Sequence, residues 1–348
     1  MIRMKDVAKK AGVSVATVSN VITGKQVVSD EVRNNVLSAI EELDYKVNLV
    51  ARGLKERKTY TVGVVLPDIT KMFFPDVLKG IMNAAEKAGY KINILSSNFD
   101  FETERSHVEY FKGSRVDGII LDSCVDKDCA SEWAHELTGS SIEATPIVSI
   151  ESVLDETLVS SVLIECEKRS AEVTQHLLDI GRKHILYISG PLSLAHGAAR
   201  LEGYLNTLKK NNINIDESLI SGGDFLSKSA YDDVLSAIKR GLRFDAVQAV
   251  NDQAAIGALK ALKESGVKVP ETVAVCGFDN LFPSTLVSPQ ITTVNVPRYS
   301  LGTMAFEELL RRMQDRSTSP QTLILETSLV IRSSTCPNAE SEWDLNNW

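Results

Sequence analysis

Residues 5–21 read KDVAKKAGVSVATVSNV, which predicts two short helices joined by a tight turn. Val7 and Ala11 recur at helical spacing on one face of the first helix. Gly12 then supplies a turn position that tolerates a positive φ, and Ser14 can cap the second helix. The stretch is typical of a helix-turn-helix, although other small helical bundles can contain the same pattern.

The second predicted helix has an outward face of short side chains, which consists of Val15, Ala16, Thr17 and Asn20. A helix with small or short polar residues on this face can enter the major groove of DNA, which is roughly 12 Å wide, and touch base edges. A third helix is predicted over 29–43, where a Ser cap and two first-turn acids precede an apolar stripe. Three such helices would close a small core.

The charge of the chain is distributed unevenly. The sequence of 348 residues has a net charge of −8, but residues 1–60 hold 11 Lys and Arg against 7 Asp and Glu, which leaves a net of −12 for the remainder. A basic segment at one end of an acidic chain is the electrostatic pattern of a nucleic-acid-binding unit joined to a body with another task. Together with the helix-turn-helix pattern, this charge distribution predicts that the segment binds double-stranded DNA.

The segment 47–59 is predicted to be a hinge between this unit and the body. Asn48 can cap a helix, but a helix this short, with an internal glycine, would not be stable alone in water. Leu54, flanked by Arg52 and Lys55, suits insertion between base steps in the minor groove, with the cations on phosphates. A flexible tether with an incidental leucine is the alternative.

These stretches together resemble the lactose repressor (LacI/GalR) family of bacterial transcription regulators. The matching blocks are residues 5–11, 18–22 and 51–55. The DNA-contacting set predicted with this resemblance consists of Lys5, Ser14, Val15, Ala16, Thr17, Asn20, Arg52, Leu54 and Lys55. By the resemblance, Val15, Ala16 and Asn20 would read bases in the major groove, and Leu54 would kink the centre of the operator. Where the family usually has proline before the hinge helix, this chain has Val47.

The remainder of the chain alternates short β-branched runs with amphipathic stretches. Strands are predicted at 61–66, 92–96, 117–121, 147–150, 185–188, 246–250 and 272–277, and helices at 75–88, 168–180, 199–210, 229–240 and 253–265. This alternation favours parallel sheets with helices on both faces, and the length suffices for two cores. We therefore predict an all-α helix-turn-helix head followed by an α/β body of two doubly wound parallel-sheet lobes.

Polar residues follow several of the predicted strands. Ligands bind outside the carboxyl ends of strands in open parallel sheets, so these residues would converge on one cleft. The predicted effector-binding set consists of Phe73, Phe74, Glu151, His196, Arg200, Phe225, Asn251, Asp252 and Asp279. Carboxylates and an amide would bind hydroxyl groups, and phenyl rings would cover an apolar ring face. Acids at strand ends can also cap helices, and we favour that interpretation for Asp68 and Asp122.

The body resembles the effector domain of the same family, which is related to periplasmic sugar-binding proteins. The blocks that carry this resemblance are residues 61–68, 115–120, 197–204, 251–258 and 277–280. The resemblance implies that Arg200, Asn251 and Asp279 contact a small-molecule effector, and it extends to about Arg332.

Two positions in the body depart from the family pattern. The family usually has Asp-Asn where this chain has Ile164-Glu165, and it often has Asp-Arg where this chain has Glu151-Ser152. Oxygen atoms of Asp279, Asn251 and Glu151 would accept hydrogen bonds from hydroxyl groups, whereas Arg200 would accommodate an acidic group. The hypothesis is therefore a neutral or phosphorylated carbohydrate.

The expected organisation follows from these blocks. It comprises a DNA-binding domain (1–46), a hinge (47–59), lobe 1 (about 60–162 and 291–322), lobe 2 (about 163–290 and 323–335) and a polar tail (336–348) that we expect to be disordered. We expect a homodimer, because symmetric dimers read pseudo-palindromic operators. The tail has no leucine heptad, so a tetramer-forming coiled coil is not expected.

Composition disfavours other classes of protein. No apolar run approaches the roughly 20 residues of a membrane span and no signal-peptide core is present, so a cytoplasmic protein is expected. The five cysteines form no CxxC pair, and with the five histidines they show no metal-ligand spacing, so neither a metal nor a cofactor is expected. No glycine-rich phosphate loop or GxSxG motif indicates an enzyme. The predicted function is an effector-responsive transcriptional repressor; the alternative is a solute-binding protein without a DNA function.

Overall fold

Two compact units, residues 1–60 and 61–348, make up the chain. The computed structural model describes residues 2–23, 27–46, 58–139 and 144–339. Within these ranges, no helix combines the length and the apolar character that a membrane span requires.

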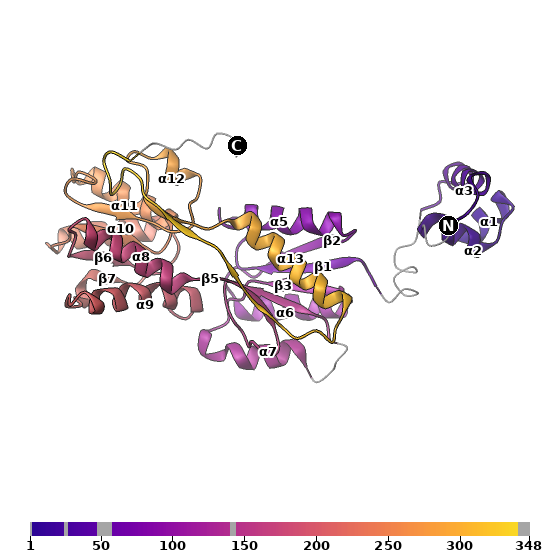
Figure 1. Ribbon diagram of the computed structural model, residues 1–348, viewed down its shortest axis with the longest axis horizontal. Helices are drawn as coiled ribbons and strands as arrows, with labels where there is room; N and C mark the ends of the chain where they lie inside the picture. The colour runs from indigo at the N-terminus through magenta and orange to yellow at the C-terminus, as the bar shows by residue number, and fades with distance from the viewer. Residues whose placement is uncertain (1, 24–26, 47–57, 140–143, 340–348) are drawn as a thin grey trace. The chain divides into compact units, whose positions relative to one another are not determined.

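Residues 2–23 and 27–46 of the first unit form three helices, α1 (Met4–Ala11), α2 (Val15–Thr23) and α3 (Asp30–Glu42), shown in indigo in Figure 1. Gly12 ends α1 with a left-handed φ of 66°. The Ser14 hydroxyl accepts a hydrogen bond of 3.0 Å from a backbone N–H in the first turn of α2. Val7, Val18 and Val36 contribute one fully buried side chain from each helix. The predicted helix-turn-helix is thereby confirmed.

The second unit consists of two lobes, and each has a parallel sheet with helices on both faces (Figure 1). Lobe 1 holds a six-stranded sheet in the order β11-β5-β4-β3-β1-β2. Its strands are β1 (Thr61–Leu66), β2 (Lys91–Ser96), β3 (Gly118–Leu121), β4 (Ile147–Ile150), β5 (Ser160–Ile164) and β11 (Thr322–Leu325). Its helices are α5 (Phe74–Lys87), α6 (Phe101–Gly113), α7 (Ala130–Thr138) and α13 (Arg298–Gln314), with a short 3₁₀ helix η1 (Lys127–Cys129).

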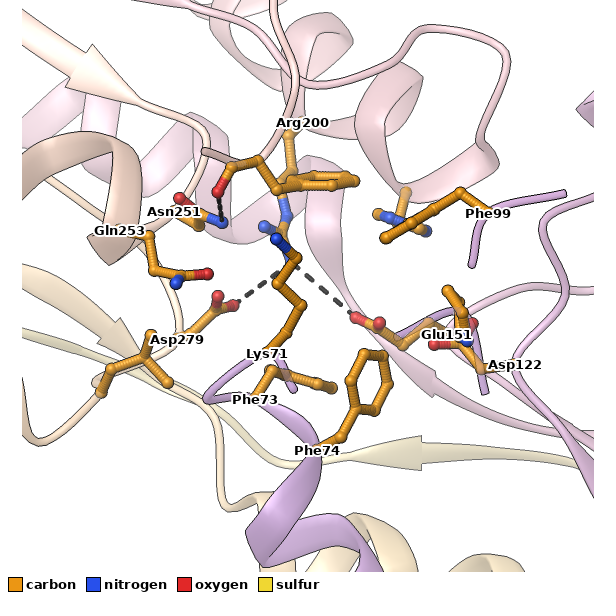
Figure 2. A pocket seen from close by; sticks show the side chains of 14 residues that line it. Lys71, Phe73, Phe74, Phe99, Asp122, Glu151, Arg200, Asn251, Gln253 and Asp279 are labelled. Carbon is orange, nitrogen blue, oxygen red and sulfur yellow. Dashed lines mark hydrogen bonds and ion pairs between the residues drawn. The ribbon is translucent and has the colours of Figure 1, made fainter. Parts of the chain in front are cut away.

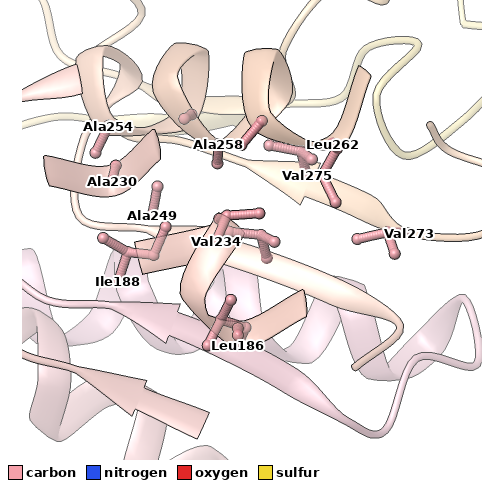
Figure 3. Close-up of a cluster of buried hydrophobic side chains, with 14 of the residues drawn as sticks. Leu186, Ile188, Ala230, Val234, Ala249, Ala254, Ala258, Leu262, Val273 and Val275 are labelled. Carbon is pink, nitrogen blue, oxygen red and sulfur yellow. The ribbon is translucent and has the colours of Figure 1, made fainter. Parts of the chain in front are cut away.

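Lobe 2 holds a four-stranded parallel sheet in the order β7-β6-β8-β9. Its strands are β6 (Ile185–Ile188), β7 (Ile220–Ser221), β8 (Ala246–Ala249) and β9 (Ala274–Cys276). Its helices are α8 (Cys166–Asp179), α9 (Ala195–Lys210), α10 (Ser227–Lys239), α11 (Asp252–Glu264) and α12 (Pro283–Leu286), with a 3₁₀ helix η2 (Glu217–Leu219). Figure 3 shows the core between this sheet and α10 and α11, where Ala254 and Ala258 let α11 lie close to the buried Val275. Burial of these apolar faces holds the layers together.

Three chain segments pass between the lobes. The first follows β5, the second contains β10 (Thr293–Asn295) and leads into α13, and the third joins β11 to β12 (Ser328–Val330), which pairs antiparallel with β10. Because β11 stays in the sheet of lobe 1 as far as Leu325, the third crossing comes a few residues later than the predicted boundary near 322.

The seven predicted strands and five predicted helices are all present, with ends that differ by at most four residues. Helices α6, α7, α12 and α13 and strands β5, β7 and β10 to β12 were not predicted. Two of these elements were hard to predict because polar residues lie on their buried faces. Glu104 in α6 and Ser160 in β5 are fully buried. The Ser160 hydroxyl donates a 2.6 Å hydrogen bond to Glu308 of α13, which links two of the missed elements.

Helices α5 and α13 pack with their backbones in contact. A Cβ atom on Gly80 would lie 2.1 Å from the carbonyl oxygen of Tyr299, and one on Gly302 would lie 2.0 Å from that of Val77. Glycine is therefore required on both helices, because any side chain would push the backbones apart.

We predict that Gly302→Ala lowers the free energy of unfolding by about 1–3 kcal/mol, because the added methyl group has no space. The matched control is Gly113→Ala in α6, where a Cβ would meet no atom within 4 Å. The control should leave the protein unchanged or stabilise it by up to about 1 kcal/mol, since alanine favours helix. Urea unfolding followed by circular dichroism measures both, and equal effects would contradict the packing argument.

Candidate ligand cleft and nucleic-acid interface

A cleft lies between the lobes, at the carboxyl ends of β1, β3 and β4 in lobe 1 and of β8 and β9 in lobe 2 (Figure 2). It is lined by Pro67, Lys71, Phe73, Phe74, Phe99, Asp122, Glu151, His196, Arg200, Phe225, Asn251, Gln253, Asp279 and Leu281. The free space within it is about 50 Å³, which is room for only a few water molecules. The lobes therefore meet closely around the cleft.

Arg200 of α9 lies at the centre of the cleft, and its side chain is only 4% exposed (Figure 2). Its Nη1 donates a 2.7 Å hydrogen bond to the carbonyl oxygen of Val250. Its Nη2 lies 3.5 Å from Asp279 Oδ1 and 3.8 Å from Glu151 Oε1, and the guanidinium stacks over the ring of Phe278. Because Glu151 belongs to lobe 1 and Asp279 to lobe 2, this one cation joins both walls of the cleft.

Burial raises the pKa values of three carboxyl groups in the cleft. Burial raises the pKa of Glu151 to about 7 and that of Asp279 to about 6, although the Arg200 guanidinium lowers both. Burial and the neighbouring Glu151 raise the pKa of Asp122 well above its usual value. Asp122 Oδ1, Glu151 Oε1 and Arg200 Nε are buried and have no hydrogen-bond partner in the described part of the chain. A ligand in the cleft could therefore use all three atoms.

Aromatic rings form much of the remaining wall. Phe73 and Phe74 meet edge to face, with ring centroids 5.4 Å apart. Phe225 is stacked between two rings, 5.4 Å from that of His196 and 6.4 Å from that of Phe99. Burial lowers the pKa of His196 to about 3, and the nearby guanidinium acts in the same direction, so its ring is neutral at pH 7. The rings offer flat apolar surfaces beside the polar groups.

The side-chain amide of Asn251 already makes hydrogen bonds within the protein. Its Oδ1 accepts a 2.8 Å hydrogen bond from the backbone N–H of Ala254 and so caps α11, and its Nδ2 donates to the carbonyl oxygen of Phe225 at 3.3 Å. Gln253 in the first turn of the same helix and Lys71 from the opposite lobe also reach the cleft (Figure 2). Lys71 Nζ lies 3.7 Å from Asp68 Oδ2.

Eight of the nine residues predicted to bind an effector line this cleft: Phe73, Phe74, Glu151, His196, Arg200, Phe225, Asn251 and Asp279. Asp252 is not among the lining residues. It is fully buried beneath them, where it accepts hydrogen bonds of 2.6 Å from the Thr293 hydroxyl and from the backbone N–H of Leu281. Asp252 thus supports the loop that carries Asp279.

The interpretation of two strand-end acids as helix caps is wrong for both. Asp68 Oδ1 accepts a 2.9 Å hydrogen bond from the backbone N–H of Thr70, which stabilises a turn rather than a helix. For Asp122 the interpretation is wrong, because it lines the cleft and the next cap along the chain is Asp126. The strand-end rule itself would have placed Asp122 in the cleft.

Other residues that line the cleft were not predicted, because the sequence around them gives a weak indication of their position or none. Gln253 lies two residues after a predicted strand-end amide, so helix geometry could have indicated it. Lys71 and Phe99 come from loops after β1 and β2, and nothing in their local sequence shows which way the loops turn.

The two departures from the family pattern lie at the edge of the cleft. A second hollow, of about 510 Å³, shares Glu151 and His196 with the cleft and is also lined by Ser152, Ile164 and Glu165. The Glu165 carboxylate lies 3.0 Å from the ammonium group of Lys168 and 3.4 Å from the guanidinium of Arg169. Its charge is therefore balanced within its own lobe.

The candidate nucleic-acid interface is the outward face of α2. Val15 is 46% exposed and Ala16 is exposed, whereas Thr17 and Asn20 are half-buried. Lys5 of α1 is exposed. The structure thus presents short side chains on the predicted recognition face.

The remaining members of the predicted DNA-contacting set are placed differently. Ser14 is exposed and caps α2, and its hydroxyl also lies 2.9 Å from that of Thr17. Arg52, Leu54 and Lys55 lie outside the described residues.

Metal and disulfide chemistry have no visible site in the described ranges. Within them, no group of three or more His, Cys, Asp or Glu side chains is arranged to hold a metal ion. All five cysteines are described there, and each has a free thiol.

Comparison with known protein families gives two matches that follow one another along the chain. The family described as "Bacterial regulatory proteins, lacI family" matches residues 3–48. The family described as "Periplasmic binding proteins and sugar binding domain of LacI family" matches residues 59–333. The first match covers the helix-turn-helix, and the second covers both lobes.

Individual proteins are similar over almost the whole chain. The catabolite control protein A of Priestia megaterium is 34% identical over 338 residues, which cover 95% of this chain and 98% of that protein. The structure titled as a transcriptional regulator CelR–cellobiose complex is 30% identical, with a TM-score of 0.71 over 96% of this chain and 100% of that one. The lac repressor dimer, bound to operator and the anti-inducer ONPF, is 27% identical, with a TM-score of 0.84 over 96% of this chain and 99% of that one.

These similarities decide between the predicted function and its alternatives. A solute-binding protein without a DNA function would not match over residues 3–48, and the similar proteins are regulators rather than enzymes. The chain therefore belongs to the LacI family of bacterial regulatory proteins and is a DNA-binding transcriptional regulator.

Proposed function

We propose that this regulator is a repressor that binds a pseudo-palindromic operator as a homodimer, and that a neutral carbohydrate in the cleft changes its affinity for the operator. The observation that carries the effector part is the set of three buried polar atoms, on Asp122, Glu151 and Arg200, that have no hydrogen-bond partner in the described part of the chain. Buried polar groups cost free energy when they lack hydrogen bonds, so a ligand that supplies the bonds binds favourably.

The DNA part rests on the exposed face of α2. Val15 and Ala16 are small enough to approach base edges closely, and Asn20 carries an amide that can pair with a base in the major groove. A homodimer presents two such helices related by a two-fold axis, so its operator has matching half-sites. The similarity to the lac repressor dimer bound to operator supports this arrangement.

The charges of the cleft favour a neutral ligand. The lining residues include three carboxyl groups, on Asp122, Glu151 and Asp279, against the two cations of Arg200 and Lys71. A phosphate or a carboxylate on the ligand could bind beside these acids only while they stayed protonated, because like charges repel strongly in a buried site. Hydroxyl groups can both donate to the carboxylates and accept from the guanidinium.

The aromatic rings favour a carbohydrate among neutral ligands. A sugar ring has one apolar face formed by C–H groups, which can lie against Phe73, Phe74 or Phe225, while its hydroxyl groups reach the polar atoms. The match to a family described by its sugar binding domain and the similarity to a cellobiose complex agree with this assignment.

An effector acts on the operator through the difference in its affinity for two states of the protein. In this proposal the relative position of the lobes depends on whether the cleft holds a ligand, and the hinge 47–59 orders or melts on the DNA accordingly. Most of the hinge lies outside the described residues. The division into a head (1–46), this hinge, two lobes (60–335) and a tail (336–348) is part of the proposal, as is a cytoplasmic location beside the operator.

The first prediction concerns the recognition helix. We expect Asn20→Ala to weaken binding to a duplex selected from a random pool by about tenfold or more, because a lost base contact removes affinity only at matching sites. Binding to sheared genomic DNA should change by less than about twofold, since phosphate contacts dominate it. The matched control is Asn35→Ala, an exposed asparagine of α3. Equal losses on both DNAs, measured by fluorescence anisotropy, would argue against base reading.

The second prediction concerns the effector. In a thermal-shift screen of neutral sugars, sugar phosphates, nucleosides and purines, we expect neutral sugars to raise the melting temperature of the full chain, because a ligand that binds only the folded state stabilises it. Asp279→Asn should abolish that shift, since it removes a carboxylate of the cleft and asparagine tolerates the positive φ of 102°.

The matched control for this screen is Asp68→Asn, which changes a strand-end acid that does not line the cleft. It should keep the shift of the wild type. Stabilisation by purines or sugar phosphates alone would refute the neutral-carbohydrate assignment.

The third prediction concerns pH. Because the folded state raises the pKa of Glu151 to about 7 and of Asp279 to about 6, it binds protons more tightly than the unfolded chain does. The free energy of unfolding should therefore decline as pH rises from 5 to 8, and the decline should be shallower in Glu151→Gln. Urea unfolding at four pH values measures the slope.

The control for the pH slope is Glu136→Gln on the surface of lobe 1. Its hydrogen bond to Arg105 lowers the pKa of this carboxyl, so its titration falls below the tested range. The control should keep the slope of the wild type. A Glu151→Gln slope equal to that of the wild type would show that this carboxyl is already ionised at pH 5.

A further inference from the structure

The turn after β2 has an unfavourable backbone conformation at Phe99, an aromatic residue. Asn98 and Phe99 are consecutive residues with left-handed φ angles of 53° and 60°. This conformation is uncommon for a residue with a bulky side chain and persists where surrounding contacts hold it. Phe99 is nevertheless 40% exposed, so its own lobe covers less than its whole ring.

The ring of Phe99 finds its partner in the other lobe. It stacks on Phe225 of lobe 2, with centroids 6.4 Å apart and an interplanar angle of 30°. Phe225 in turn stacks on His196, 5.4 Å away at 24°. The three rings form one stack that runs from lobe 1 into lobe 2 along the wall of the cleft.

The two sides of this contact differ in how firmly they are held. A Cβ on Gly190 would lie 2.7 Å from the Phe225 ring, so this ring packs directly against the backbone at Gly190. The backbone carbonyl oxygen of Phe225 also accepts a hydrogen bond from the Asn251 side chain. Phe99 lies on an exposed turn and is itself 40% exposed. When the lobes separate, Phe99 is therefore the ring that leaves.

A backbone hydrogen bond between the lobes accompanies the ring contact. The N–H of Lys127, at the start of η1 in lobe 1, donates to the carbonyl oxygen of Ser193 in lobe 2 at 2.8 Å. This bond breaks when the lobes part, so hydrogen exchange at Lys127 reports the opening of the cleft.

We propose that Phe99 is a gate residue: its contact with Phe225 holds the lobes together at this side of the cleft and must break before a ligand of sugar size can enter. The free space of about 50 Å³ is too small for such a ligand while the rings touch. The consequence for effector entry rests on the proposed function. The ring contact itself is a property of the chain and is testable without an effector.

The test is hydrogen exchange of the full chain at single-residue resolution, without added ligand. Stacked aromatic pairs contribute enough free energy that Phe99→Ala should speed exchange at the Lys127 amide by about three- to tenfold. Phe99→Gly should do the same, and glycine adopts this φ without strain, so this variant guards against misfolding of the turn. Phe99→Tyr, which keeps the ring, should return the rate to within about twofold of the wild type.

Two controls separate opening of the cleft from general loss of stability. The Val250 amide, which bonds to Ile188 within the sheet of lobe 2, should exchange at an unchanged rate in every variant. Tyr110→Ala removes a 60% exposed ring from α6 of the same lobe and should leave Lys127 unaffected. An unchanged Lys127 rate in both Phe99→Ala and Phe99→Gly, or an equal rise at Val250, would overturn the proposal.

Discussion

A guanidinium removed from water must be surrounded by compensating groups, and the cleft of this regulator is organised around that requirement. Arg200 donates a hydrogen bond to the Val250 carbonyl oxygen, its charge is balanced by Glu151 and Asp279, and its guanidinium stacks on the ring of Phe278. Because the two carboxyl groups come from opposite lobes, separation of the lobes leaves the cation with fewer partners. The charge balance of Arg200 therefore depends on the relative position of the two lobes.

The centre of this arrangement was predictable from the sequence. A parallel sheet brings the carboxyl ends of its strands to one edge, so the rule places Asn251 and Asp279 together in lobe 2 and Glu151 at the corresponding edge of lobe 1. Arg200 came from resemblance to a family rather than from geometry. The helix-turn-helix was equally accessible, because Gly12 and Ser14 mark its turn and its cap by local chemistry alone.

Other features depend on contacts that local sequence does not encode. Asp252 follows Asn251 in the chain, but the first turn of α11 points it into the protein, toward Thr293, which is 41 residues away in sequence. Helix α6 carries the buried Glu104, whose carboxyl group accepts hydrogen bonds from Ser123 and Trp133. The sequence of α6 therefore lacks a continuous apolar face. A helix or strand with such a polar network on its buried face is not detected by hydrophobic periodicity.

The contact between α5 and α13 has a mechanical consequence. Side chains that separate most helix pairs can change rotamer and absorb displacement, but at Gly80 and Gly302 no such layer exists. The two helices consequently behave as one stiff lever. Helix α5 begins at Phe74, on the wall of the cleft, and its 14 residues span about 20 Å. We expect a shift imposed at the cleft end of α5 to move α13 with it, because no layer of side chains separates the two helices at these glycines.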